Sequence, residues 1–204
     1  MTMISLILLD LNGVLYRYDR PTRIARLAGL AGRMPEAVLR SIWESGFEDS
    51  GDEGALDEAA YLRGFGACLG YPVTEAEWVA ALRPALTPIP ESLALMRRPR
   101  PDVRRAVLTN NNLLVSRHFA TFYPDIAALV GPHAYVSATF GARKPAVEVY
   151  RRCLARLGVA PDATLFVDDN AANVAGARAA GLHGYLYTDP ASLAAELSRL
   201  GLLA

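Results

Sequence analysis

The sequence contains no glutamine and a single lysine, Lys144, although it contains twenty arginines. A lysine retained against that bias predicts a role that arginine cannot fill, because lysine is a compact point charge and arginine is a planar fork. The chain also has only six asparagines, in three short clusters that each follow an apolar run: Asn12, Asn110, Asn111, Asn112, Asn170 and Asn173. Asparagines favour turns in any protein. Two of these clusters also contain aspartates, however, and we interpret the three as parts of one polar pocket.

Excess charge, paired cysteines and long apolar runs are absent as well. The formal net charge is zero at pH 7, so the basic excess typical of nucleic-acid-binding proteins is missing. Cys68 and Cys153 lie far apart within apolar helical patterns, and we expect small buried side chains rather than a disulfide or a metal pair. The apolar segment 1–9 is too short to span a bilayer and lacks the basic and cleavage regions of a signal peptide. These absences predict a cytoplasmic protein with no nucleic-acid or membrane partner.

The composition is that of a globular chain, with 52% hydrophobic and 21% charged residues among 204. Five short apolar, β-prone runs are predicted as strands: 4–9, 106–109, 134–137, 164–167 and 184–187. Helical patterns follow or separate the later runs, at 113–122, 145–157, 171–180 and about 191–200. This alternation predicts an α/β fold with a Rossmann-like, doubly wound parallel sheet. Nothing in the pattern fixes an oligomeric state.

Residues 16–90 follow a different pattern, in which helical segments succeed one another without a strand signal. Four helices are predicted, at 22–30, 35–46, 57–69 and 74–86. Residue types that favour helix starts mark three of them: Pro35, Asp57, and Thr74 with Glu77 three residues later. The segment is too long for a crossover between two strands. We therefore interpret 16–90 as an all-helical cap, inserted into a core domain formed by 1–15 and 91–204.

Three polar clusters follow predicted strands at the edge where open α/β sheets bind their ligands. They begin at Asp10, Thr109 and Asp168, and Lys144 precedes the helix that leads into the fourth strand. Each has an ordinary structural explanation: an aspartate at a strand end often caps a helix, and Asp168-Asp169 resembles an exposed turn. Their order along the chain and their common position favour a single site.

That order resembles the haloacid dehalogenase-like hydrolase superfamily. The stretches similar to its four motifs are LILLDLNGVL, AVLTNNN, GARKPAVEVY and LFVDDNAANVAGARAAG, within about two thirds of the chain. The place of the insertion matches the helical-cap subgroup, which includes sugar-phosphate phosphatases and the phosphatase domain of soluble epoxide hydrolases. The RKP, FVDDNA and YPDI stretches are most similar to bacterial α-glucose-1-phosphate phosphatases.

The resemblance implies a Mg²⁺-dependent phosphatase that acts on a small phosphorylated metabolite, such as a sugar phosphate. Asp10 would be the nucleophile that attacks phosphorus and becomes an aspartyl phosphate. The carboxylates of Asp10, Asp168 and Asp169 and the backbone carbonyl of Asn12 would hold Mg²⁺, which prefers oxygen ligands.

The remaining implied site residues bind the phosphate group. Thr109 and the backbone amide of Asn110 would bind phosphate oxygens, and Lys144 would pair with both Asp10 and the phosphate. Positioning and charge stabilisation would supply most of the rate.

Substrate choice is expected to lie in the cap, which would close over the core and exclude water. Polar or aromatic candidates near its entrance are Tyr16, Arg17, Tyr18, Trp43 and Glu48. Arg17 is our candidate substrate contact. Trp43 and Tyr61 lie at apolar helical spacing, and we interpret both as core packing.

One residue departs from the family pattern. Phosphatases of this superfamily usually carry a second aspartate two residues after the nucleophile, as general acid and then base. This chain has Asn12 there, which cannot titrate, and such assistance is typically worth about 10²–10⁴-fold. We hypothesise that the leaving group needs little protonation, as with an anomeric hydroxyl. Acyl, anomeric or aryl phosphates should then react faster than simple alkyl phosphates.

Two other functions are compatible with Asn12. The chain could be a catalytically impaired relative that binds a phosphorylated ligand or a protein partner. It could also be a 2-haloacid dehalogenase, a class that lacks the second aspartate and uses no metal. Retention of Asp168 and Asp169 argues against dehalogenation, and retention of Asp10, Thr109 and Lys144 favours an active phosphatase.

Overall fold

A five-stranded parallel sheet forms the core of the structure, a computed structural model that describes residues 3–204. The strand order is β5-β4-β1-β6-β7. The bounds are β1 (Leu6–Leu9), β4 (Arg104–Thr109), β5 (Ala134–Val136), β6 (Thr164–Asp168) and β7 (His183–Leu186). All five predicted strands are confirmed. The first two residues of the predicted core segment 1–15 lie outside the described residues.

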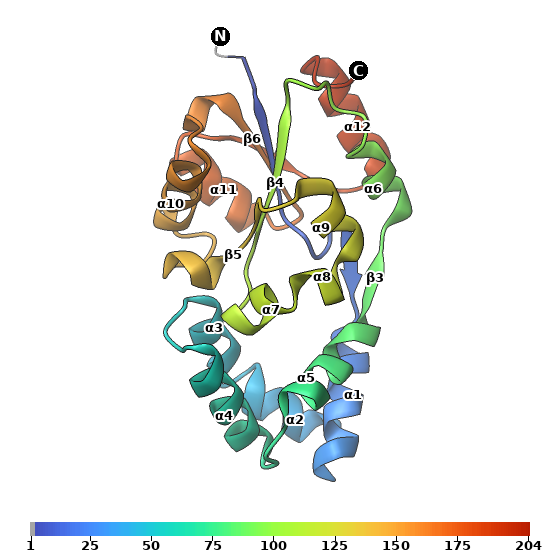
Figure 1. The fold of residues 1–204 in the computed structure, drawn as a ribbon, viewed down its shortest axis with the longest axis vertical. Helices are drawn as coiled ribbons and strands as arrows, with labels where there is room; N and C mark the ends of the chain where they lie inside the picture. The colour runs from blue at the N-terminus through green and yellow to red at the C-terminus, as the bar shows by residue number, and fades with distance from the viewer. Residues whose placement is uncertain (1–2) are drawn as a thin grey trace.

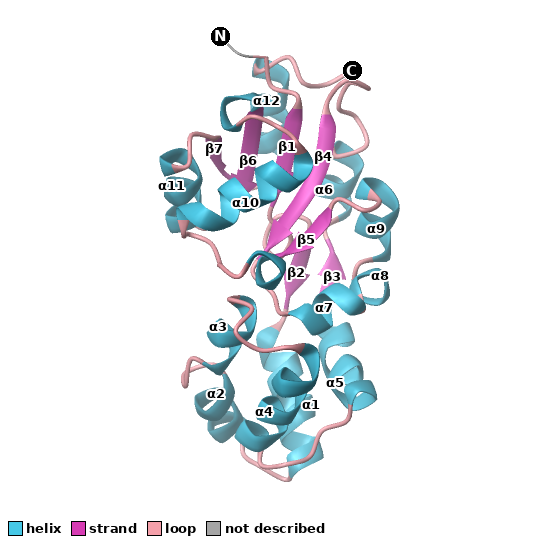
Figure 2. Ribbon diagram, turned by 60° about the vertical axis from the view of Figure 1, so that its left-hand side comes forward, coloured by secondary structure: helices cyan, strands magenta, loops and turns pink. Residues whose placement is uncertain are grey.

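Helices cover both faces of this sheet because its central strands are apolar on both faces. Leu6 and Leu8 of β1 are fully buried on one face, beside α10 (Val147–Leu157) and α11 (Ala171–Ala179). Ile7 and Leu9 are buried on the other face, with α6 (Pro90–Leu95), α9 (Pro124–Val130) and α12 (Pro190–Arg199). Each such side chain stabilises the fold by roughly 1.5–3 kcal/mol. The predicted doubly wound α/β core is confirmed (Figure 2).

Five helices form a separate group at the end of the molecule that faces the carboxyl ends of the strands (Figure 1). They are α1 (Arg20–Ala31), α2 (Pro35–Ile42), α3 (Phe47–Asp52), α4 (Glu58–Leu69) and α5 (Glu75–Leu82), and we call this group the cap. The Thr74/Glu77 capping box is present at the start of α5, and Asp57 caps α4. Aromatic side chains fill its interior, where the ring centroids of Tyr61 and Trp78 lie 5.9 Å apart.

The expectation that no strand interrupts residues 16–90 is wrong. β2 (Tyr16–Tyr18) and β3 (Leu86–Pro88) form an antiparallel ribbon between the cap and the core. The predicted helix 74–86 therefore stops early, because Pro84 cannot continue an α-helix and a short 3₁₀ turn leads into β3. The ribbon lies close to both predicted domain boundaries, which themselves stay a prediction.

The predicted helix 113–122 is also divided, into α7 (Leu113–Arg117) and α8 (Phe119–Phe122). Pro124 ends α8 and begins α9, because the residue before a proline is displaced from helical geometry. No helix within residues 3–204 is both long enough and apolar enough to cross a membrane.

Candidate active site

Lys144 joins two strand ends that are far apart in the sequence. Its Nζ atom donates to Oδ1 of Asp10 and to Oδ2 of Asp168, each at 2.7 Å. Asp10 follows β1, Asp168 is the last residue of β6, and Lys144 lies in the loop before α10. Lys144 is only 2% exposed, and its ammonium lies 5.4 Å from the ring centroid of Phe166. A narrow cation fits this enclosed position, which accounts for a lysine in an arginine-rich chain.

The electrostatics of these three residues are coupled. Burial raises the pKa of Asp10 to about 6; the Lys144 ammonium opposes that rise and the charge of Asp168 adds to it. Burial disfavours the charged form of Lys144, but the two carboxylates outweigh it and raise the pKa of the ammonium above its ordinary value. The two carboxylates therefore favour the charged form of Lys144 beside Asp10.

Asp10, Asp168 and Asp169 offer carboxylate oxygens that lie within 4.8 Å of one another. The backbone N–H of Asn170 donates to Asp168 at 2.8 Å, and the Asn173 side chain donates to both of its oxygens at 3.1 Å. Carboxylates gathered so closely repel one another unless cations compensate them. An all-oxygen donor set of this kind suits Mg²⁺.

Gly13 makes room for this cluster. Its φ of +97° is in the left-handed region, and a Cβ there would lie 2.1 Å from Oδ2 of Asp169. Any larger residue would displace the Asp169 carboxylate. The loop after β1 is therefore shaped to bring Asp169 beside Asp10, which supports the fit of a cation to these residues.

The loop after β4 lies against the same residues. Thr109 is buried, and its Oγ1 accepts a hydrogen bond of 2.9 Å from Nδ2 of Asn111. The Asn110 side chain forms two bonds of 2.9 Å with the backbone of Lys144, one to its N–H and one to its carbonyl. The sequence predicts only a role for the Asn110 backbone amide, so the clamp on Lys144 is an additional function of its side chain.

A polar cavity of about 260 Å³ lies between the cap and these loops. Its lining includes the core residues Asn12, Asn110, Asn111, Tyr123 and Arg143, and the cap-side residues Tyr18, Arg20, Arg23, Trp43, Glu48, Asp49, Asp52 and Leu82. Tyr18, Trp43 and Glu48 therefore line this cavity, and their role as substrate contacts stays a prediction. The half-buried ring of Trp43 lines the cavity and also packs against the hydrophobic core, and Tyr61 is buried as expected.

Tyr16 and Arg17 do not line this cavity. Arg17 is an exposed residue of β2 and contributes to a different surface cavity, with Gly13 and Tyr187. The strand alternates its side chains, so Tyr18 faces the polar cavity and Arg17 faces away from it.

Arg23, which the sequence does not predict for the site, takes a prominent place at the cavity wall. It is 4% exposed and enclosed by the rings of Trp43, Phe65 and Trp78 at 5.2–5.5 Å. Its Nη1 lies 3.7 Å from Glu48, which also accepts a hydrogen bond of 2.6 Å from the Tyr61 hydroxyl. An arginine on the otherwise apolar face of α1 is the sequence signal for such a residue.

Acidic side chains of α3 form another part of the wall. Burial raises the pKa of Asp52 well above its ordinary value, the charge of Glu48 adds to the rise, and Arg143 opposes it. Arg143 also forms an ion pair with Asp49. The cavity therefore combines carboxylates, guanidinium groups and one indole ring, which are suited to a ligand with several hydrogen-bonding groups.

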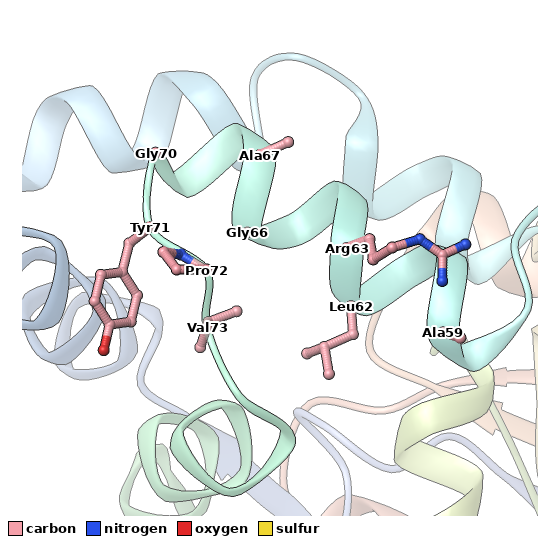
Figure 3. A pocket seen from close by; sticks show the side chains of 9 residues that line it. All are labelled: Ala59, Leu62, Arg63, Gly66, Ala67, Gly70, Tyr71, Pro72 and Val73. Carbon is pink, nitrogen blue, oxygen red and sulfur yellow. The ribbon is translucent and has the colours of Figure 1, made fainter.

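A larger cavity of about 590 Å³ lies on the surface of the cap, along α4 and the segment that follows it (Figure 3). Its lining is mostly apolar, and Arg63 is its only charged residue. None of the predicted site residues contributes to it. The volume of a cavity therefore does not identify the candidate active site in this molecule.

Curated relatives match part of this chain. A phosphatase of Mycobacterium tuberculosis is 39% identical over 93 residues, which are 46% of this chain and 42% of the relative. The chain spans less than half the length of the curated relatives it matches.

Two solved structures cover nearly the whole fold. A predicted HAD-like family hydrolase of Porphyromonas gingivalis has a TM-score of 0.80 and 25% identity, with 98% of each chain covered. A HAD family enzyme of Bacteroides thetaiotaomicron, in complex with magnesium and inorganic phosphate, has a TM-score of 0.74 and 21% identity, covering 91% of this chain and 94% of that one. The model of the family described as haloacid dehalogenase-like hydrolase matches residues 4–181. With most of its length matched and its carboxylates gathered around one lysine, the chain belongs to the haloacid dehalogenase-like hydrolases.

Proposed function

We propose that the protein is a Mg²⁺-dependent phosphatase that hydrolyses a small phosphorylated metabolite through an aspartyl phosphate at Asp10. The observation that carries this proposal is the pair of 2.7 Å contacts from Lys144 to Asp10 and Asp168, with the Asp169 carboxylate close by. The named phosphatase among the relatives and the magnesium and phosphate bound to a structural neighbour support it.

The carboxylates of Asp10, Asp168 and Asp169, with the backbone carbonyl of Asn12, would hold the cation. When bound, Mg²⁺ supplies positive charge that allows a carboxylate to approach a phosphate dianion. Lys144 holds Asp10 in place and adds positive charge next to the nucleophile.

Thr109 and the backbone N–H of Asn110 would bind the phosphate oxygens. An Asp10 oxygen then forms a bond to phosphorus while the bond from phosphorus to the leaving oxygen breaks. Water subsequently hydrolyses the aspartyl phosphate, which releases phosphate and restores Asp10. Lys144 and Thr109 are fixed before the substrate arrives, so they lose little freedom during the reaction.

We propose a sugar phosphate as the substrate class. A hydroxyl-rich leaving group matches the carboxylates of Glu48 and Asp52, which accept hydrogen bonds, and the ring of Trp43, on which a sugar can pack. In place of Arg17, we propose Arg20 and Arg23 as cap arginines near the substrate. The free cysteines and balanced charge fit a cytoplasmic location, which we also propose.

The competing functions give different results in one experiment. Phosphate release is measured on a panel that includes glucose 1-phosphate, glucose 6-phosphate, acetyl phosphate and p-nitrophenyl phosphate, with Mg²⁺ or with EDTA. The wild type should release phosphate only with Mg²⁺, most slowly from glucose 6-phosphate, and Asp10→Asn should lose at least 10³-fold, as nucleophile removal does elsewhere.

Background release from both proteins would support the impaired binder instead. Chloride release from 2-chloropropionate that persists in EDTA would support the dehalogenase.

A further inference from the structure

A tyrosine from the segment between α8 and α9 contacts the residue that departs from the family pattern. Tyr123 is 1% exposed, and its hydroxyl donates to Oδ1 of Asn12 at 3.4 Å. The two residues are 111 positions apart in the sequence, and both line the polar cavity. Resting on the proposed phosphatase function, we propose that Tyr123 is a positioning residue that orients the Asn12 carboxamide so that its Nδ2 donates to the leaving-group oxygen.

The ring of Tyr123 is held from several sides. Tyr16 of β2 packs edge-on against it, with centroids 5.0 Å apart and planes at 87°, and Phe119 lies at 5.2 Å. Tyr16 is itself fixed, because its hydroxyl donates to Asp125 at 3.1 Å. The position of the Tyr123 hydroxyl is thus determined by packing between the ribbon of β2 and β3 and the core, before any ligand binds.

The hydroxyl of Tyr123 remains a hydrogen-bond donor. The phenol is buried, and a tyrosine hydroxyl is protonated at neutral pH. A protonated phenol that donates to Oδ1 selects one orientation of the carboxamide. In that orientation Nδ2 has two N–H groups to donate, and we find no protein acceptor for them among residues 3–204.

The direction of the carboxamide matters because charge develops on the leaving oxygen. As Asp10 bonds to phosphorus, the electron pair of the breaking bond moves to that oxygen, which an N–H of Asn12 stabilises without giving up its proton. The oxygen then takes a proton from water. The 3.4 Å separation is longer than an ordinary O–H···O bond, and such contacts often tighten only in the reacting complex.

Tyr123→Phe tests the proposal because it removes only the hydroxyl. We expect kcat/KM for glucose 6-phosphate, an alkyl phosphate with a poor leaving group, to fall by about 10-fold or more, in line with the value of one oriented donor. The value for p-nitrophenyl phosphate, whose leaving group is stable as an anion, should fall by less than about 3-fold because it needs little hydrogen bonding.

Asn12→Ala supplies the second arm, because it keeps the backbone carbonyl but removes the carboxamide. It should show the same selective loss on glucose 6-phosphate, and Tyr123→Phe should then add no further loss in the double variant. Tyr187→Phe is the matched control, since its hydroxyl pairs with Ser92 at 2.9 Å outside the polar cavity.

Two results would overturn the inference. One is an equal loss on both substrates in Tyr123→Phe. The other is an equal loss on both substrates in Asn12→Ala. This second result is decisive even if Tyr123→Phe does not fold. Failure of the phosphatase function itself looks different, because the wild type and Asp10→Asn would then be equally inactive on every substrate.

Discussion

Lys144 illustrates how much a single residue type can reveal. Its rarity in the chain marks it, and its burial between Asp10 and Asp168 explains it, because the planar guanidinium of arginine needs more width than one ammonium nitrogen. Asn110 then fixes the backbone of Lys144 through its side chain. The side chain of Asn110 thus helps to hold Lys144 between the two carboxylates.

At this scale we predict that Lys144→Arg lowers phosphate release by at least about 10²-fold, because the displaced charge no longer meets both carboxylates. Lys144→Met should reduce the free energy of unfolding by roughly 3–5 kcal/mol, because two buried carboxylates lose their counter-charge. Urea denaturation and phosphate release measure these effects. Arg199→Lys, on an exposed ion pair with Glu196, is the control. An active Lys144→Arg enzyme would contradict the assigned role.

The cap contacts the core at other places besides the ribbon of β2 and β3. Glu75 at the start of α5 accepts from Arg117 at 3.2 Å and lies 2.6 Å from the ring nitrogen of His118, both at the end of α7. Arg117 also pairs with Glu58 of α4 at 3.0 Å. These contacts hold the cap over the carboxyl ends of the strands, where the polar cavity lies.

We predict that Glu75→Ala weakens cap closure. Exposed ion pairs contribute about 0.2–1 kcal/mol each, so the loss should raise KM by roughly 2- to 10-fold while kcat changes little. Steady-state kinetics measure this, with Glu196→Ala as a control that breaks an exposed ion pair on α12. An unchanged KM in Glu75→Ala would show that the contacts of Glu75 with Arg117 and His118 do not affect closure.

The elements differ in how far the sequence predicts them. Long periodic segments and strands with continuous apolar runs are predicted well, because period and residue type are local properties. The ribbon of β2 and β3 is not predicted, since each strand has three residues and gains its stability from a partner some 70 positions away. The short helix α3, which carries Asp49 and Asp52, is not predicted for a similar reason. It is held in place by a contact with the core, in which the Ser137 hydroxyl donates to the Asp52 carbonyl at 2.7 Å.

On the scale of the whole molecule, the proposed cation site connects the ends of β1 and β6, so metal binding there should raise global stability. We predict that Mg²⁺ raises the thermal unfolding midpoint of the wild type. Binding at a concentration 100 times Kd would add about 2.7 kcal/mol to the free energy of unfolding. EDTA should reverse the shift. Differential scanning calorimetry measures it without any substrate.

Asp169→Asn should show a smaller shift with Mg²⁺, because one carboxylate ligand is lost. Asp102→Asn, on an exposed loop pair with Arg100, should behave as the wild type does. A shift of the same size in all three proteins would mean that Mg²⁺ binds elsewhere.

The sequence by itself determined the parallel sheet, the family and the order of the site residues Asp10, Thr109, Lys144 and Asp168. It could do so because strand patterns and the residues that follow each strand are properties of short segments. Only the tertiary structure decided which side chains face the cavity. Arg23 lies there and Arg17 does not, because the rotation of α1 and the alternation of β2 are set by packing. The contact between Tyr123 and Asn12 likewise exists only after segments 111 residues apart have come together.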